Sequence, residues 1–296
     1  MAAARRPGGG RAEYLLELHR ADGSVDRTLD PLNPVRVGGV FGDKSVVEFP
    51  GYEPPRWLGT AAPPGQMTAF AARNGHLGAE VTGSVWVPSG LADGQPAPLL
   101  VVHDGPEYDR LADLTRYLAV CIAGEKVPPL RALRLHPGDR NHWYAAHPAY
   151  ARALHEDVLP AVPGVTRRIG MGTSLGALAM LHAYRHDPSA FDGLFLQSGS
   201  FFTERTDPQE RRFPQFAEVT RFVGEVHDAG VGGSGLFSLT CGLGEENLAC
   251  NRLMARTLAA LGHRVALHGV RDAHNYTCWR DGLDPHLAAL LREALA

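Results

Sequence analysis

The chain has 296 residues and a formal net charge of −3 at pH 7. Hydrophobic residues make up 44% and charged residues 21%, a globular composition in which no apolar run approaches the ~18 residues of a membrane span. This composition predicts neither a nucleic-acid partner, which would need a basic surface, nor a membrane partner. The sequence does not predict an oligomeric state.

Two N-terminal segments precede the regular part of the sequence. Residues 1–12 are rich in glycine, alanine and arginine, and we expect a disordered tail without the apolar region of a signal peptide. Residues 13–64 contain short extended runs broken by Pro, Gly and Asp. This pattern predicts a β-rich or irregular arm, which the aromatic and proline cluster at 51–58 packs onto the main body.

The cysteines are widely spaced and form no C-x-x-C pair. We expect free thiols in a reducing cytoplasm and no metal site, with a Cys250–Cys278 disulfide as the alternative. The four cysteines are Cys121, Cys241, Cys250 and Cys278.

From residue 65 to 296, apolar runs of strand length alternate with segments of helical periodicity. This alternation predicts an α/β fold with a mostly parallel central sheet and helices on both faces. The predicted strands are an antiparallel pair within 66–88, then 98–104, 130–136, a run ending at Gly170, 193–199, 235–242 and 263–270. The predicted helices are 108–123, 148–159, the segment after Ser174, 208–226, 247–261 and 279–296.

Residues 172–176 read Gly-Thr-Ser-Leu-Gly, a G-x-S-x-G motif between a predicted strand and a predicted helix. In this context the motif is typical of a nucleophile elbow, a tight turn that presents Ser174 at the edge of the sheet. The flanking glycines remove Cβ atoms that would collide in such a turn. The alternative is a glycine-rich turn with an incidental serine.

A nucleophilic serine needs a base and an acid that orients the base, and in α/β-hydrolases these follow the serine in the order acid, histidine. Glu245 and Glu246 follow the strand 235–242, and His274 follows the strand 263–270. We predict His274 as the base and favour Glu245 as the acid. Glu246 remains an alternative, and Asp272 is a weaker one because it is close to His274 in sequence.

Acyl transfer also requires two backbone N–H groups that stabilise the oxyanion. Leu175, directly after the serine, is predicted to supply the first. The second is expected from the segment after strand 98–104, where Pro106 has no N–H. The candidates are Gly105, Glu107 and Tyr108, of which we favour Glu107.

Several segments together resemble the enterochelin-esterase (siderophore esterase) branch of the esterase D family of α/β-hydrolases. They span roughly residues 65–296 in order. They are LLVVHDGPEYDR, HPAYARALHEDVLPAVP, GMGTSLGALAML, CGLGEENLACNRLMARTLAALGH and RDAHNYTCWRDGL. The resemblance implies Ser174 as nucleophile, His274 as base and an acidic residue of the GLGEEN turn as third member.

These observations predict a serine carboxylic-ester hydrolase that forms an acyl-enzyme and needs no cofactor. By the resemblance, its substrate is a small ester such as a catecholate siderophore, whose planar anionic groups suit cationic and aromatic side chains. The candidate substrate-binding residues are Tyr108, Arg140 and Trp279. The alternatives are an acyltransferase with the same three residues and a ligand-binding protein without catalytic activity.

Overall fold

The computed structural model describes residues 10–73, 75–92 and 94–296. Its centre is a sheet of eight strands in the order β13-β12-β11-β10-β8-β9-β7-β6. The strands from β13 to β9 run parallel, whereas β7 is antiparallel to both β9 and β6. The strand bounds are β6 (Gln66–Ala72), β7 (Val81–Val87), β8 (Ala97–Val102), β9 (Arg131–Leu135), β10 (Val165–Thr173), β11 (Gly193–Gln197), β12 (Leu236–Gly242) and β13 (Arg264–Val270).

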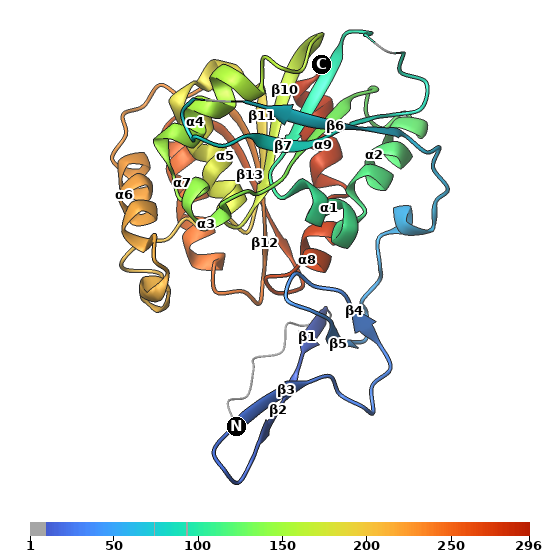
Figure 1. Cartoon of the computed structure of the whole chain (residues 1–296), viewed down its shortest axis with the longest axis vertical. Coiled ribbons are helices and arrows are strands. Elements are labelled where there is room, and N and C mark those ends of the chain that lie inside the picture. Colours follow the sequence, from blue (N-terminus) through green and yellow to red (C-terminus); the bar gives the residue numbers. More distant parts are fainter. Residues whose placement is uncertain (1–9, 74, 93) are drawn as a thin grey trace.

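Helices cover both faces of this sheet, so the predicted α/β architecture is confirmed (Figure 1). The helices are α1 (Gly105–Ala112), α2 (Leu114–Ala123), α3 (Arg140–Trp143), α4 (Pro148–Ala153), α5 (Leu175–His186), α6 (Phe216–His227), α7 (Leu248–Ala260), α8 (Tyr276–Asp281) and α9 (His286–Ala294). A π-helical turn continues α4 (Leu154–Val158), and short 3₁₀ turns occur at Arg56–Gly59, Pro188–Ala190 and Pro208–Arg212.

Alternate residues of the buried strands enter two separate hydrophobic layers. In β11, Leu194 and Leu196 pack with α4, α5, α6 and α7, whereas Phe195 packs with α1, α2 and α9. Successive side chains of a strand point to opposite faces, so a continuous apolar run serves both layers. This explains why the central strands were predictable from short apolar runs alone.

Three predicted helices are each divided in the structure. The segment predicted at 208–226 is a 3₁₀ turn (Pro208–Arg212) followed by α6 (Phe216–His227). The helix predicted at 108–123 begins earlier, at Gly105, and is interrupted at Asp113, whose φ of 49° lies in the left-handed region. The Asp109 carboxylate accepts hydrogen bonds from the N–H and the hydroxyl of Thr115, which fixes the start of α2. The segment predicted at 279–296 is likewise α8 and α9, separated around Pro285, which has no N–H to donate.

The N-terminal arm contains five short strands among its described residues. Figure 1 shows it (blue) below the main body, beside α8. Its antiparallel sheet has the order β1-β5-β4, and β2 and β3 form a hairpin. The bounds are β1 (Arg11–Tyr14), β2 (Leu16–His19), β3 (Val25–Thr28), β4 (Arg36–Val37) and β5 (Lys44–Glu48). Residues 1–9 of the predicted tail lie outside the described residues, but residues 11 and 12 belong to β1 because they pair with β5.

All four cysteines are buried and unpaired, so Cys250 and Cys278 form no disulfide. Across the described residues, no helix combines the length and apolar character needed to cross a lipid bilayer.

Candidate active site

The three predicted catalytic residues lie at one edge of the sheet. Ser174 directly follows β10, Glu245 lies in the turn after β12, and His274 lies in the loop after β13. These strands are parallel, so their carboxyl ends meet at the same edge. Ser174 and His274 line the same two adjoining cavities, and Glu245 lines one of them.

Ser174 adopts a backbone conformation that non-glycine residues rarely occupy, with φ 55° and ψ −122°. A Cβ on Gly172 would lie 2.3 Å from the carbonyl oxygen of Gly176, and a Cβ on Gly176 would lie 3.1 Å from His103. Close backbone packing therefore requires glycine at position 172, and the buried His103 side chain leaves little room for a side chain at position 176. This is the tight turn expected of a nucleophile elbow.

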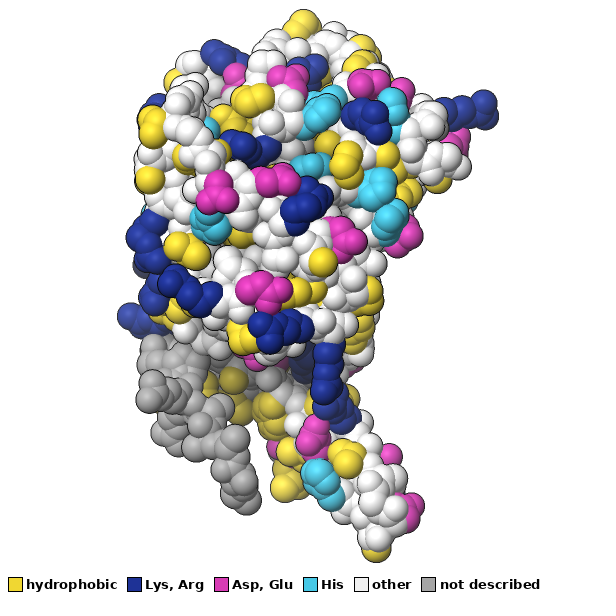
Figure 2. All heavy atoms as spheres, turned by 90° about the vertical axis from the view of Figure 1, so that its left-hand side faces the viewer, with side chains coloured by type: hydrophobic (Ala, Val, Ile, Leu, Met, Phe, Trp, Pro, Cys, Tyr) yellow, Lys and Arg dark blue, Asp and Glu magenta, His cyan; other side chains and the backbone are white. Residues whose placement is uncertain are grey.

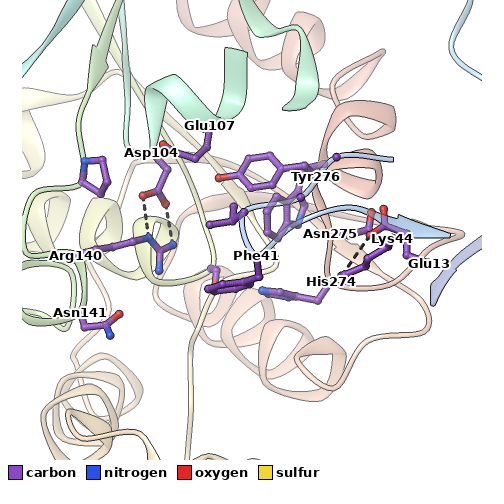
Figure 3. Close-up of a pocket in the computed structure, with 16 residues that line it drawn as sticks. Glu13, Phe41, Lys44, Asp104, Glu107, Arg140, Asn141, His274, Asn275 and Tyr276 are labelled. Carbon is purple, nitrogen blue, oxygen red and sulfur yellow. Dashed lines mark hydrogen bonds and ion pairs between the residues drawn. The ribbon is translucent and has the colours of Figure 1, made fainter. Parts of the chain in front are cut away.

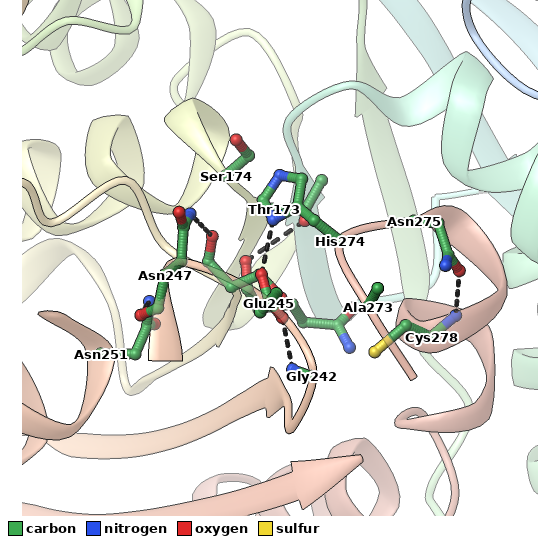
Figure 4. Close-up of polar contacts among 12 residues, drawn as sticks. Thr173, Ser174, Gly242, Glu245, Asn247, Asn251, Ala273, His274, Asn275 and Cys278 are labelled. Atoms are coloured by element: carbon green, nitrogen blue, oxygen red, sulfur yellow. Dashed lines mark hydrogen bonds and ion pairs between the residues drawn. The ribbon is translucent and has the colours of Figure 1, made fainter. Parts of the chain in front are cut away.

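His274 and Glu245 form a close pair. His274 Nδ1 lies 2.6 Å from Glu245 Oε2, while Glu245 Oε1 accepts hydrogen bonds from the Ser198 hydroxyl at 2.6 Å and from the Gly242 N–H (Figure 4). Burial raises the pKa of Glu245, but the hydrogen bonds from His274 and Ser198 outweigh burial and hold that pKa below its ordinary value. Glu245 is thus a buried carboxylate: its Oε1 is held by Ser198 and Gly242, and its Oε2 contacts the imidazole of His274.

The two alternative acids make different contacts. Glu246 is exposed and lines the outer wall of the cavity that holds Ser200. Asp272 is buried, and its carboxylate contacts Arg11 and Asn275. Of the three carboxylates, Glu245 is the one that contacts His274 in the part of the chain that the structure describes.

The Ser174 hydroxyl is oriented toward another serine. Ser174 Oγ lies 3.2 Å from Ser200 Oγ, and no hydrogen bond to His274 occurs among the described contacts of Ser174. Ser200 is buried, and its N–H donates to the Ser174 carbonyl oxygen. No sequence pattern predicts the contact with Ser200, because its position after β11 carries no motif that connects it to the elbow.

A cavity of about 420 Å³ opens on the side of the arm. It is lined by Ser174, His274 and Trp279. Arg140 from the main body and Phe41 from the arm line it as well (Figure 3). Lys44 and Glu13 of the arm also line the cavity. This volume is within the range of small-molecule sites.

Arg140 contributes a positive charge that is held in place. Its guanidinium makes two hydrogen bonds of 2.8 Å to the Asp104 carboxylate and lies 5.6 Å from the ring centre of Tyr144. Burial lowers the pKa of Arg140, but Asp104 more than compensates, and the net pKa is raised. The predicted residue therefore lies in the cavity, although one side of its guanidinium is already bound by Asp104.

Tyr108 does not line either cavity, and its prediction as a substrate-binding residue is wrong. Its side chain is fully buried beneath the site, and its hydroxyl donates to Gln197 Oε1 at 2.8 Å. Trp279, by contrast, lines the cavity, stands perpendicular to the His274 ring at 5.0 Å, and donates from Nε1 to Ser198 Oγ at 2.9 Å.

Both predicted oxyanion-hole residues lie at helix starts near Ser174. Leu175 is the first residue of α5. Glu107 lies in the first turn of α1 and lines the arm-side cavity together with Ser174. Amides of a first helical turn have no acceptor within the helix and can serve an anion. Pro106 in the same turn contributes no N–H, as its residue type requires.

The site contains no arrangement for a metal. Within ranges 10–73, 75–92 and 94–296, no group of three or more His, Cys, Asp or Glu side chains is placed to hold a metal ion. The groups described above are those of nucleophilic and general-base chemistry.

Comparisons with known proteins agree with this architecture. The chain is 28% identical over 246 residues to an iron(III) enterobactin esterase of Dickeya dadantii, covering 76% of this chain and 55% of that protein. It is 25% identical over 211 residues to the iron(III) enterobactin esterase of Escherichia coli K12, covering 67% of this chain and 51% of that protein. The chain thus spans about half the length of these relatives.

Among solved structures, the enterobactin esterase of Shigella flexneri, determined in the presence of enterobactin, matches with a TM-score of 0.77 and 21% identity. The match covers 97% of this chain and 78% of that chain, and it supports the α/β-hydrolase fold. The model of the family described as "Putative esterase" matches residues 75–290, well over half of the sequence. The chain therefore belongs to this esterase family.

Proposed function

We propose that the protein is a serine carboxylic-ester hydrolase with Ser174 as nucleophile, His274 as general base and Glu245 as the acid that orients His274. The observation that carries this proposal is the 2.6 Å pair of His274 Nδ1 and Glu245 Oε2 beside a serine whose φ is 55°. Membership of the esterase family supports the same reaction class.

In the proposed reaction, the Ser174 hydroxyl turns from Ser200 toward His274 Nε2, which takes its proton as the oxygen attacks the ester carbonyl. Such contacts are often long or absent without substrate and tighten when it binds. The N–H groups of Leu175 and of the first turn of α1, with Glu107 as the favoured donor, stabilise the tetrahedral oxyanion. The alcohol leaves with the proton from His274. Water then attacks the acyl-enzyme while His274 takes a proton from it, and His274 returns that proton to Ser174 as the carboxylic acid leaves.

The proposed substrate is a small ester with planar anionic or aromatic groups, such as a catecholate siderophore lactone. Arg140 and Lys44 line the arm-side cavity, each beside a carboxylate (Asp104 and Glu13), while Phe41, Tyr276 and Trp279 supply aromatic surface. Relatives that act on enterobactin support this choice. The four unpaired cysteines support a reducing compartment such as the cytoplasm.

The test is covalent labelling of Ser174 with a fluorophosphonate, together with hydrolysis of a p-nitrophenyl ester and of an iron-free trilactone siderophore followed by mass spectrometry. We expect the wild type to be labelled and Ser174→Ala to lose both labelling and turnover while unfolding at an unchanged temperature. Activity retained by Ser174→Ala would refute the assignment of the nucleophile. Turnover of simple esters without cleavage of the trilactone would refute the siderophore substrate and leave the esterase.

A further inference from the structure

A buried ion pair connects the N-terminal arm to the loop that carries His274. Arg11 Nη1 lies 3.1 Å from Asp272 Oδ2, and the two side chains are 4% and 3% exposed. The residues are 261 positions apart in sequence. We propose that Arg11 is a positioning residue for the reaction, which aligns His274 by fixing Asp272; this rests on the proposed role of His274 as the base.

Asp272 connects three parts of the site. Its Oδ1 accepts hydrogen bonds from the Ala273 N–H at 2.7 Å and from Asn275 Nδ2 at 2.9 Å, which fixes the residues on both sides of His274. Its carbonyl oxygen accepts from the Gly244 N–H at 3.0 Å, in the turn that carries Glu245. The position of Asp272 therefore sets the positions of both the base and the acid.

Arg11 is the group that holds the remaining oxygen of Asp272. Its guanidinium also contacts Glu13 Oε1 at 3.1 Å, and Lys44 lies 3.4 Å from the other oxygen of Glu13. Burial lowers the pKa of Arg11, but Asp272 and Glu13 outweigh burial and raise its pKa above the ordinary value. Arg11 is thus a permanent positive charge, and removing it would leave the Asp272 carboxylate buried without its counter-ion.

Further contacts seat the arm against the same loop. A Cβ on Gly10 would lie 1.8 Å from the carbonyl oxygen of Arg271, so only glycine permits this approach of the two backbones. The Tyr52 hydroxyl donates to Asp281 Oδ2 at 2.8 Å and accepts from Arg280 at 3.1 Å, which attaches the end of the arm to α8. Arg11 therefore acts from a segment that is itself anchored on both sides of the loop.

The consequence is kinetic. His274 must approach Ser174 closely in the transition state, and a displacement of about 1 Å can cost a rate factor on the order of 100. A shift of the loop should lower kcat and leave KM nearly unchanged, because neither Arg11 nor Asp272 lines the arm-side cavity. This pattern separates positioning from substrate binding.

The test compares Arg11→Met, Arg11→Lys and Asp272→Asn in the full-length protein, with a p-nitrophenyl ester as the substrate. We expect Arg11→Met and Asp272→Asn to lower kcat by roughly 10- to 100-fold with KM within about twofold. Arg11→Lys should regain most of the lost kcat, because it restores the charge. The matched control is Arg27→Met on the β2–β3 hairpin, whose exposed partner is Glu17; it should behave as the wild type.

The rate of Ser174 labelling by a fluorophosphonate should fall in parallel with kcat. Wild-type kcat in Arg11→Met or in Asp272→Asn would overturn the positioning role. If Arg11→Met does not fold, as judged by circular dichroism, the Asp272→Asn variant decides the question by the same criteria. Absence of Ser174 labelling in the wild type would overturn the proposed function and this inference together, whereas normal wild-type labelling with unaffected variants overturns only the inference.

Discussion

The main body and the N-terminal arm are stabilised in different ways. In the body, strands such as β8, β9 and β11 are almost wholly buried between two hydrophobic layers. In the arm, Arg11 and Ser45 are buried although they are polar, while Leu32 and Phe41 are 91% and 101% exposed. Figure 2 shows the arm as a narrow projection with hydrophobic side chains at its surface.

This difference separates two kinds of contribution to the site. The body supplies the three proposed catalytic residues from a rigid sheet edge, and the arm supplies a wall of the cavity and the ion pair to Asp272. Changes in the body should therefore affect the chemical step or the free energy of unfolding. Changes in the β4–β5 loop of the arm, which lines the cavity, should affect substrate binding alone, and each prediction below tests one side of this division.

The largest expected effect is on catalysis, from the carboxylate that contacts His274. Glu245→Gln should lower kcat by about 10²- to 10⁴-fold, because the neutral amide no longer orients the imidazole or stabilises its charged form. Glu246→Gln is the matched control at the adjacent exposed position and should stay within about twofold of the wild type. Steady-state kinetics on a p-nitrophenyl ester measure both. Equal small losses would contradict the triad and indicate that Ser174 and His274 act as a pair.

Acid should destabilise the body. Burial lowers the pKa of His103, His182 and His286 to about 4 in each case. Since these values lie below the ordinary value of about 6.5, the unfolded state binds more protons between pH 6.5 and 4. The stability that neutral histidine provides is present above about pH 6.5 and is lost as the pH falls toward 4.

For the fully buried His103 this loss is on the order of 3 kcal/mol in the free energy of unfolding. Denaturant unfolding at pH 7 and pH 4.5 measures it, and His103→Asn should reduce the difference between the two pH values. The control is His19→Gln on the exposed hairpin, which should leave the difference unchanged. A His103→Asn protein with the wild-type pH dependence would contradict the assignment.

A smaller loss of stability is expected from Tyr108→Phe. Removing the hydroxyl leaves the buried Gln197 Oε1 without its donor, which should cost about 1–3 kcal/mol in the free energy of unfolding. KM should not change, since Tyr108 lies beneath the site. Tyr14→Phe in the arm loses a hydroxyl that donates to Asp30 at 2.7 Å beside solvent, and should cost less. A raised KM in Tyr108→Phe would restore Tyr108 as a substrate-binding residue.

The same division explains what the sequence predicted. The strands and the order Ser174, Glu245, His274 follow from apolar runs and from residues placed just after them, which are local signals. The interruption at Asp113 depends on a single left-handed residue and carried no such signal. Tyr108 was misplaced because proximity to a strand end does not reveal which face of α1 a side chain occupies.

The missed residues depend on contacts between distant segments. Arg11 was assigned to a disordered tail, since glycine, alanine and arginine around it give no strand pattern. Its partner Asp272 was considered only as a rival acid. Their pairing across 261 positions is a tertiary contact that no local pattern encodes.

The smallest expected effect concerns Phe41, in the loop of the arm between β4 and β5 (residues 38–43). Its side chain lines the arm-side cavity but is fully exposed, so its removal costs no packing. Stacking against an aromatic ester is worth roughly 0.5–1.5 kcal/mol, so Phe41→Ala should raise KM about two- to tenfold with kcat and the unfolding temperature unchanged.

The matched control for Phe41→Ala is Leu32→Ala. The Leu32 side chain is also almost fully exposed on the arm, but it does not line the cavity. Leu32→Ala should leave KM unaltered. Comparing methyl benzoate with methyl acetate, neither of which has an aromatic leaving group, isolates the stacking contribution, since only the benzoyl group presents an aromatic face. If Phe41→Ala binds both esters as the wild type does, the Phe41 side chain takes no part in binding, and the contact of Arg11 with Asp272 remains the proposed influence of the arm on the site.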